Sequence, residues 1–102
     1  MYILASLAQG ELHGYGIARD VEELSDGRVR LTAGTLYGAL NRLSADGFVE
    51  PAGERKVQGR RRRYYRLTAA GHTELRAEVE RLRSAAAALG ARVATRPTPG
   101  LA

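Results

Sequence analysis

The stretch GRRRRYYRLT, residues 59–68, decides how this chain folds, because it joins a run of arginines to two tyrosines and a leucine. A run of like charges alone is typical of a disordered tail, but such tails are poor in aromatic residues. Side chains alternate between the two faces of a strand, so Tyr65 and Leu67 share one face. Leu67 is expected to point into a core, and Tyr65 with it. Residues 61–67 are therefore predicted to form the return strand of a hairpin.

The rest of that hairpin lies just before the arginines. Residues 48–54 read as the first strand, and residues 55–61 as a turn that contains Gly59. The arginines on the Tyr65 face, Arg61 and Arg63, lie further out toward the tip of the hairpin. Those positions extend beyond a small core, where their charges can reach phosphate groups. The alternative is a hairpin whose charges serve only solubility.

Three helices are predicted before the hairpin and one after it. They cover residues 2–8, a segment that begins near residue 13, residues 33–46, and residues 69 to about 90. Thr32 and Thr68 stand where N-caps belong, and Gly27 and Gly47 where helices end. Apolar residues recur at spacings of three and four in the second and third helices, which is the pattern of a buried stripe (Ile17, Val21, Leu24; Leu36, Leu40, Leu43).

This order of elements predicts a mainly α fold with a small β-hairpin. Three short helices followed by a basic hairpin make a winged helix-turn-helix, in which the third helix enters the major groove of DNA and the hairpin, or wing, contacts the flanking backbone or minor groove. We expect residues 1–67 to form that DNA-binding domain, residues 68–92 a C-terminal dimerisation helix, and residues 93–102 a flexible tail.

Positive charge is concentrated in the middle of the chain. Residues 28–66 hold ten basic and three acidic residues, whereas the remainder holds six basic and eight acidic ones, for a formal net charge of +5 over 102 residues. This asymmetry favours a polyanionic partner for the middle segment. A solvated basic surface that only aids solubility is the alternative.

Composition limits the other classes of function. The chain has no cysteine, which excludes disulfides and cysteine-based metal sites, and no apolar run reaches the roughly 18 residues of a membrane span. The two histidines, His13 and His72, lack neighbours at metal-ligand spacing, and His13 is expected to pack or to cap a helix. No nucleophile-base pair or cofactor loop is recognisable. We expect a cytoplasmic, nucleoid-associated protein that needs no cofactor and is not an enzyme.

Three motifs resemble the PadR family of bacterial transcriptional regulators. They are HGYG at residues 13–16, GTLY at residues 34–37, and YYRLT at residues 64–68 followed by Gly71. With a single C-terminal helix, the chain is most similar to the short subfamily. The resemblance implies a homodimeric winged-helix protein that binds an operator, usually as a repressor, and in some members is released by a phenolic or drug-like effector. Where the family often has proline, this chain has Gly38.

The DNA-contacting residues are predicted from the outer face of the third helix and from the hairpin. In the helix, threonine, asparagine and arginine side chains can bond to phosphates or base edges, and glycines leave room for close approach. Tyr37 could reach a phosphate or pack at the edge of the core. The predicted contacts in the helix are Thr32, Gly34, Thr35, Tyr37, Gly38, Asn41 and Arg42, and those in the wing are Lys56, Gln58, Arg60, Arg61, Arg62 and Arg63.

The last helix carries a heptad-like apolar seam, with alternating steps of four and three (Leu75, Val79, Leu82, Ala86, Leu89). Packing on its own domain is one explanation. A helix of about 22 residues, or roughly 33 Å, exceeds what so small a core can cover, so a partner helix from a second subunit is the other. The alanines at residues 85–88 would allow close helix packing or leave a cavity at the dimer interface.

Two functions of different classes follow. The first is a sequence-specific, homodimeric DNA-binding regulator, expected to act as a repressor on a double-stranded operator and to be released by a small aromatic or drug-like effector. The alternative is a winged-helix module that binds proteins and not DNA. The basic hairpin favours the first, since DNA binding through such residues falls steeply with salt.

Overall fold

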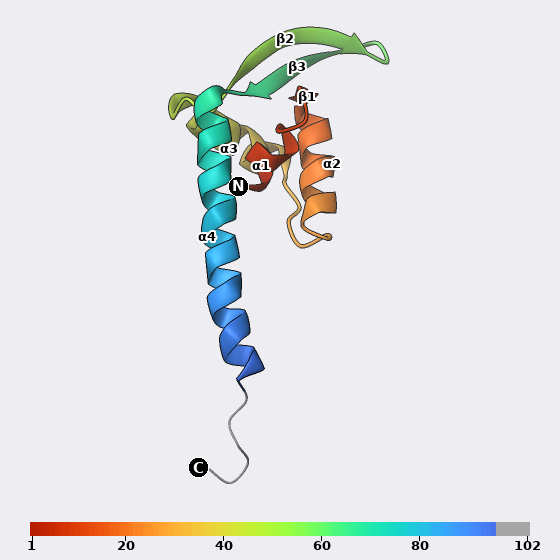
Figure 1. Ribbon diagram of the computed structural model, residues 1–102. Helices are drawn as coiled ribbons and strands as arrows, with labels where there is room; N and C mark the ends of the chain where they lie inside the picture. Colours follow the sequence, from red (N-terminus) through yellow and green to blue (C-terminus); the bar gives the residue numbers. More distant parts are fainter. Residues whose placement is uncertain (96–102) are drawn as a thin grey trace.

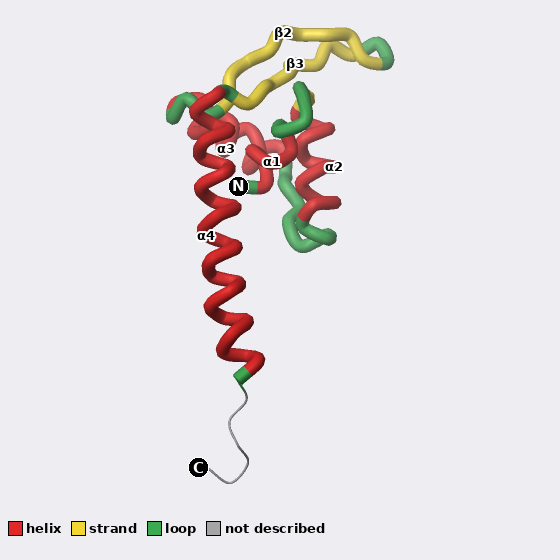
Figure 2. Tube along the Cα trace, in the orientation of Figure 1, coloured by secondary structure: helices red, strands yellow, loops and turns green. Residues whose placement is uncertain are grey.

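The computed structural model describes residues 1–95 (Figure 1). Helix α1 spans Tyr2–Ser6, α2 Gly14–Leu24, α3 Ala33–Ala45 and α4 Ala69–Ala94; strand β1 spans Leu12–His13, β2 Val49–Val57 and β3 Arg60–Leu67. The first three helices cluster beneath the sheet, and α4 extends far beyond the rest of the described chain (Figure 2). This is the predicted helix-helix-helix-hairpin-helix order, and the winged-helix prediction is confirmed at this level.

Three helices begin at the residues that can cap them. The side chains of His13, Thr32 and Thr68 each accept a hydrogen bond from the backbone N–H three residues further on, at 3.1, 3.3 and 3.0 Å. Each satisfies one of the N–H groups that a helix start leaves without a partner. The Thr68 hydroxyl also donates to the carbonyl of Gly47, at 2.6 Å. This second bond ties the start of α4 to the end of α3.

The sheet has a strand that the sequence pattern did not predict. Its order is β1-β3-β2, and the two-residue β1 pairs antiparallel with β3, Leu12 opposite Tyr65 and His13 opposite Tyr64. A two-residue strand is too short to show the alternation by which strands are recognised. The pairing brings the start of α2 beside the wing.

The wing is longer than predicted and its turn is tighter. β2 continues to Val57 and β3 starts at Arg60, so the turn is only Gln58 and Gly59 rather than residues 55–61. Both turn residues have positive φ, 52° and 78°, as a type I′ hairpin turn requires. A register irregularity between Pro51 and Glu54 marks a bulge in β2, and such bulges bend a strand and increase its twist.

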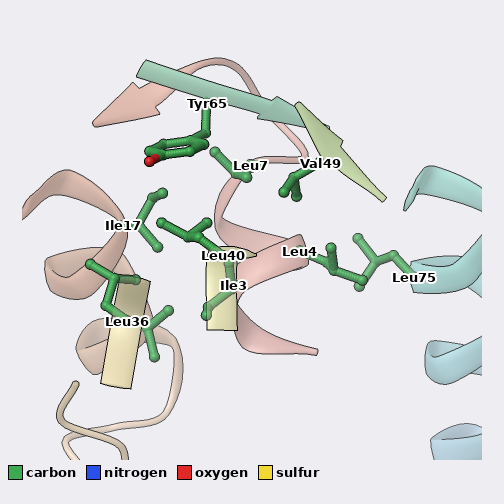
Figure 3. Close-up of a cluster of buried hydrophobic side chains, with 10 residues drawn as sticks. Ile3, Leu4, Leu7, Ile17, Leu36, Leu40, Val49, Tyr65 and Leu75 are labelled. Atoms are coloured by element: carbon green, nitrogen blue, oxygen red, sulfur yellow. The ribbon is translucent and has the colours of Figure 1, made fainter. Parts of the chain in front are cut away.

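The core lies where the three helices meet the sheet. Ile17, Val21, Leu40 and Val49 are the largest side chains that are fully buried. Tyr65 is 6% exposed, and its side chain projects from β3 into this cluster (Figure 3). The prediction that Tyr65 anchors the arginine run in the core is confirmed. The wing beyond it has no such anchor and consists of the paired strands β2 and β3.

Helix α4 contacts the core only through its first turns. Leu75 is buried and points toward Leu4 of α1 (Figure 3). Its assignment to the dimer seam is therefore corrected, because Leu75 packs within its own domain. Residues 79–95 are all exposed. The helix also runs past the predicted end near Gly90, to Ala94. The predicted tail therefore begins too early, and its residues 96–102 lie outside the described part of the chain.

Candidate nucleic-acid interface

The outer face of α3 is open to solvent. All seven residues predicted there are exposed, and a Cβ added at Gly34 or Gly38 would meet no atom within 4 Å. On the opposite face, Leu36 and Leu40 are buried in the core, so the helix has one buried face and one solvent-exposed face. A small, polar, unobstructed helix face can be inserted in a groove as wide as the major groove of B-DNA.

Tyr37 connects this face to the start of α2. Its side chain is 46% exposed, and a Cβ added at Gly14 would lie 2.6 Å from its hydroxyl oxygen. The glycine at the first position of α2 therefore makes room for the ring. Tyr37 therefore packs against the start of α2 while about half of the residue stays exposed, and its contact with a phosphate stays a prediction.

The wing arginines divide between the two faces of the hairpin. Arg61 and Arg63 are exposed on the Tyr65 side, beyond the core, as predicted. Arg60 and Arg62 face the other way, with Tyr64 and Arg66, and Arg62 is only partly exposed because it lies over Tyr15 of α2, 5.9 Å from the ring centroid.

Carboxylates neutralise part of the positive charge. Glu11 forms an ion pair with Arg55 and lies 3.8 Å from Arg66, and Arg66 also donates to Glu50 at 2.7 Å. The hydrogen bond to Glu50 and its charge raise the pKa of Arg66. At the tip, Arg61 lies 3.6 Å from Glu54.

Several other cations of the wing, α2 and α3 are available to a partner. Within residues 1–95, Arg19, Arg42, Lys56, Arg60, Arg62 and Arg63 form no ion pair with a carboxylate. Four of these belong to the wing, one to α3 and one to α2. Uncompensated positive charge therefore lies on the wing, with one further unpaired cation on α2 and one on α3.

Sequence reasoning missed the start of α2 as part of this surface. His13 contacts the Tyr64 ring edge-on at 5.3 Å between centroids, and Tyr15 is 58% exposed between Arg19 and Arg62. Burial, and then the charge of Arg62, lower the pKa of His13. The HGYG motif was a visible signal, but only the unpredicted β1–β3 pairing shows that it lies next to the wing.

Within residues 1–95, no helix combines the length and apolarity that would let it cross a bilayer. The same range holds no cluster of three or more histidine, aspartate or glutamate side chains suited to hold a metal ion.

Known proteins are similar to this chain in sequence and in fold. The transcriptional regulator PadR-like family matches residues 3–77. Transcriptional regulator Rv3488 of Mycobacterium tuberculosis is 43% identical over 75 residues, which cover 74% of this chain and 66% of that protein. An uncharacterised 37.1 kDa protein in transposon TN4556 of Streptomyces fradiae is 44% identical over 78 residues, which cover 76% of this chain. The chain thus spans about two thirds of the first relative and 21% of the second.

Solved structures agree with the sequence comparison. A transcriptional regulator from Clostridium thermocellum superposes with a TM-score of 0.72 at 26% identity, covering 87% of this chain and 86% of that one. Bacillus subtilis PadR in complex with operator DNA superposes with a TM-score of 0.65 at 27% identity, covering 76% of this chain and 44% of that one. The family consists of transcriptional regulators, which confirms the prediction of a regulator over an enzyme. This chain belongs to the PadR-like family of transcriptional regulators.

Proposed function

We propose that this protein is a DNA-binding transcriptional regulator that inserts α3 into the major groove and lays its wing on the flanking backbone or minor groove. The observation that carries the proposal is the exposed, glycine-spaced face of α3 beside a wing with four unpaired cations. Its relative from Bacillus subtilis was solved with operator DNA. Base contacts would come from Thr35, Asn41 and Arg42, and phosphate contacts from the wing.

The protein acts as a homodimer in this proposal. Val79, Leu82 and Leu89 of α4 are 39, 49 and 66% exposed in the single chain, and Val93 continues the same heptad seam at 77%. Apolar side chains in this pattern are stabilised when a second helix covers them. A two-fold dimer would present two α3 helices to half-sites about one helical turn of DNA apart.

Repression is the proposed outcome of operator binding, with release by a small aromatic or drug-like effector. Both rest on the family resemblance. The chain contains no tryptophan, so an effector stacked on that residue is excluded. The alanines of residues 85–88 are the place along the dimer seam where small side chains would leave room for such a molecule.

Substitution of Arg42 tests the docking of α3. Genome-wide capture of bound DNA identifies the operator, and binding of that duplex is then measured by fluorescence anisotropy for the wild type and Arg42→Ala. Loss of a bidentate base contact costs about 1–3 kcal/mol, or roughly 5- to 150-fold in Kd, and relaxes preference at one base pair. Arg30→Ala is the matched control, because Arg30 is already paired with Glu22 at 3.2 Å. Unchanged affinity and unchanged sequence preference for Arg42→Ala would count against this docking.

A further inference from the structure

A cleft of about 450 Å³ separates the wing from the start of α2. The α2 side contributes His13, Tyr15 and Arg19, and the wing contributes Arg60 and Arg62. Among residues 1–95, no carboxylate lines it. Three guanidinium groups around one opening, with no acidic side chain among them, form an electropositive recess that favours an anion.

Arg62 lies at the centre of this arrangement. Its Nε is shielded from solvent, and it has no hydrogen-bond partner within residues 1–95. Leaving such a donor without a partner costs free energy, more so when the group is charged, and each case in a native protein calls for an explanation, such as a missing ion. Its guanidinium and that of Arg19 lie 5.9 and 6.0 Å from the centroid of the same Tyr15 ring. Both arginines thus contact one tyrosine ring, and both line the same cleft.

The cleft also has a defined place on the proposed DNA-binding surface. Tyr37 of α3 packs against Gly14 at the start of α2, and Arg62 of the wing lies over Tyr15 in the same turn. The start of α2 therefore lies between the helix proposed for the major groove and the wing. In a duplex, the structure that separates one groove from the next is the sugar-phosphate backbone.

We propose that this cleft is a phosphate-binding site, formed by Arg19, Arg62 and the Tyr15 hydroxyl. Arginine presents several N–H donors in a geometry that matches phosphate oxygens. The positive end of the α2 dipole adds to the attraction. A backbone phosphate of DNA would occupy the site if the proposed DNA binding holds, and the inference rests on it to that extent. A free phosphate group has the same chemistry, so the experiment has an arm for each source.

The DNA arm compares salt dependence among variants of the full chain. Each phosphate neutralised on B-DNA adds about 0.9 to the slope of log affinity against log salt. Arg19→Gln and Arg62→Gln are expected to weaken operator binding without changing base preference. Because both guanidiniums serve one phosphate, the double variant should lose about 0.9 of slope and not about 1.8. Arg66→Gln is the control, since Arg66 lies on the same face of β3 and is already paired with Glu50 and Glu11.

The free-phosphate arm uses no DNA. Inorganic phosphate is titrated against the wild type at matched ionic strength with chloride, while NMR follows the Arg62 Nε–H and the Tyr15 amide. Movement of both signals in the wild type, with no movement of the Tyr15 amide signal in Arg62→Gln, supports a site that also accepts free phosphate. A slope loss in the DNA arm alone assigns the site to a backbone phosphate, and movement in this arm alone assigns it to a soluble phosphate ligand.

The proposal fails when both arms are negative. That result is unmoved signals with inorganic phosphate, together with cleft variants that keep the affinity and slope of Arg66→Gln. Wild-type protein that binds no duplex would instead refute the proposed function, and the free-phosphate arm would then decide on the cleft alone.

Discussion

Truncation of Leu82 tests the proposed dimer through α4. In the single chain, Leu82 is 49% exposed, so about half of its side chain remains to be covered by a partner. Full burial of a leucine is worth about 1.5–3 kcal/mol, and the uncovered half is worth about 1 kcal/mol. A two-fold dimer contains this residue twice. Leu82→Ala is therefore expected to weaken the dimer by about 2 kcal/mol, or roughly 30-fold in Kd.

Truncation of Leu89 tests the same relation between the exposed fraction of a side chain in the single chain and the loss of dimer affinity. It is 66% exposed, so Leu89→Ala is expected to weaken dimerisation more than Leu82→Ala, by about 2.7 kcal/mol, or roughly 100-fold in Kd on the same arithmetic. The order of the two effects follows from exposure in the single chain. It would not follow from the sequence, in which both residues are leucines on one seam.

The assay is sedimentation equilibrium on the full chain at several concentrations, or subunit exchange if dissociation lies below the range of the ultracentrifuge. Ser84→Ala is the matched control, because Ser84 lies on the same exposed part of α4 but off the seam. It should leave Kd unchanged. A Leu82→Ala variant whose Kd stays within about threefold of wild type would refute this use of α4, as would an equal loss in Ser84→Ala.

Two further predictions concern stability. Gly71→Ala should lower the free energy of unfolding, measured in urea, by about 2–4 kcal/mol. The added Cβ would lie 2.1 Å from the Phe48 carbonyl oxygen, so the cap and the hydrogen bonds that join α3 to α4 would have to shift. Gly38→Ala, which meets no atom within 4 Å, should instead gain up to about 1 kcal/mol; similar values for the two variants would contradict this reasoning. For His13, whose pKa is lowered in the fold by burial and by Arg62, the unfolded chain binds the proton more readily. The contribution of His13 to the free energy of unfolding is therefore complete above about pH 6.5, and it is lost as the pH falls through the lower pKa of His13 in the folded state. When the free energy of unfolding is measured from pH 7.5 to 5, the His13→Asn variant should lose less stability than the wild type, because its side chain can still accept the hydrogen bond from Gly16. His72→Asn is the control. Equal pH dependence of the unfolding free energy in all three proteins would show that His13 does not contribute.

The sequence was informative where one residue type at one position carries the structural signal. Thr32 and Thr68 were predicted as caps because threonine before an apolar period has few other local roles, and both accept the expected bonds. The face of α3 followed from its period, since leucine at every third or fourth position leaves the remaining side exposed. Tyr65 followed from strand alternation with Leu67.

The misses have a common cause, which is that they depend on contacts between distant parts of the chain. β1 exists because residues 12 and 13 lie beside residues 64 and 65, and nothing local marks so short a strand. The strands of the wing extend beyond the residues that carry an apolar pattern, because backbone pairing near the tip does not depend on side chains buried in the core. Leu75 is indistinguishable in the sequence from the other leucines of its heptad seam, yet α1 covers it. The cleft was missed for the same reason, since α2 and the wing form its walls.

Ion pairing also changes how the basic composition should be understood. Ten basic residues lie in residues 28–66, but four of them already face carboxylates, namely Arg30, Arg55, Arg61 and Arg66. Glu11 and Glu50 neutralise the base of the wing, where it joins the core, and leave its outer half and the cleft beside α2 charged. A count of basic residues would therefore overstate the number of phosphates that the protein neutralises. The salt slope of operator binding should be smaller than that count predicts, and the unpaired side chains Arg19, Arg42, Lys56, Arg60, Arg62 and Arg63 should account for most of it.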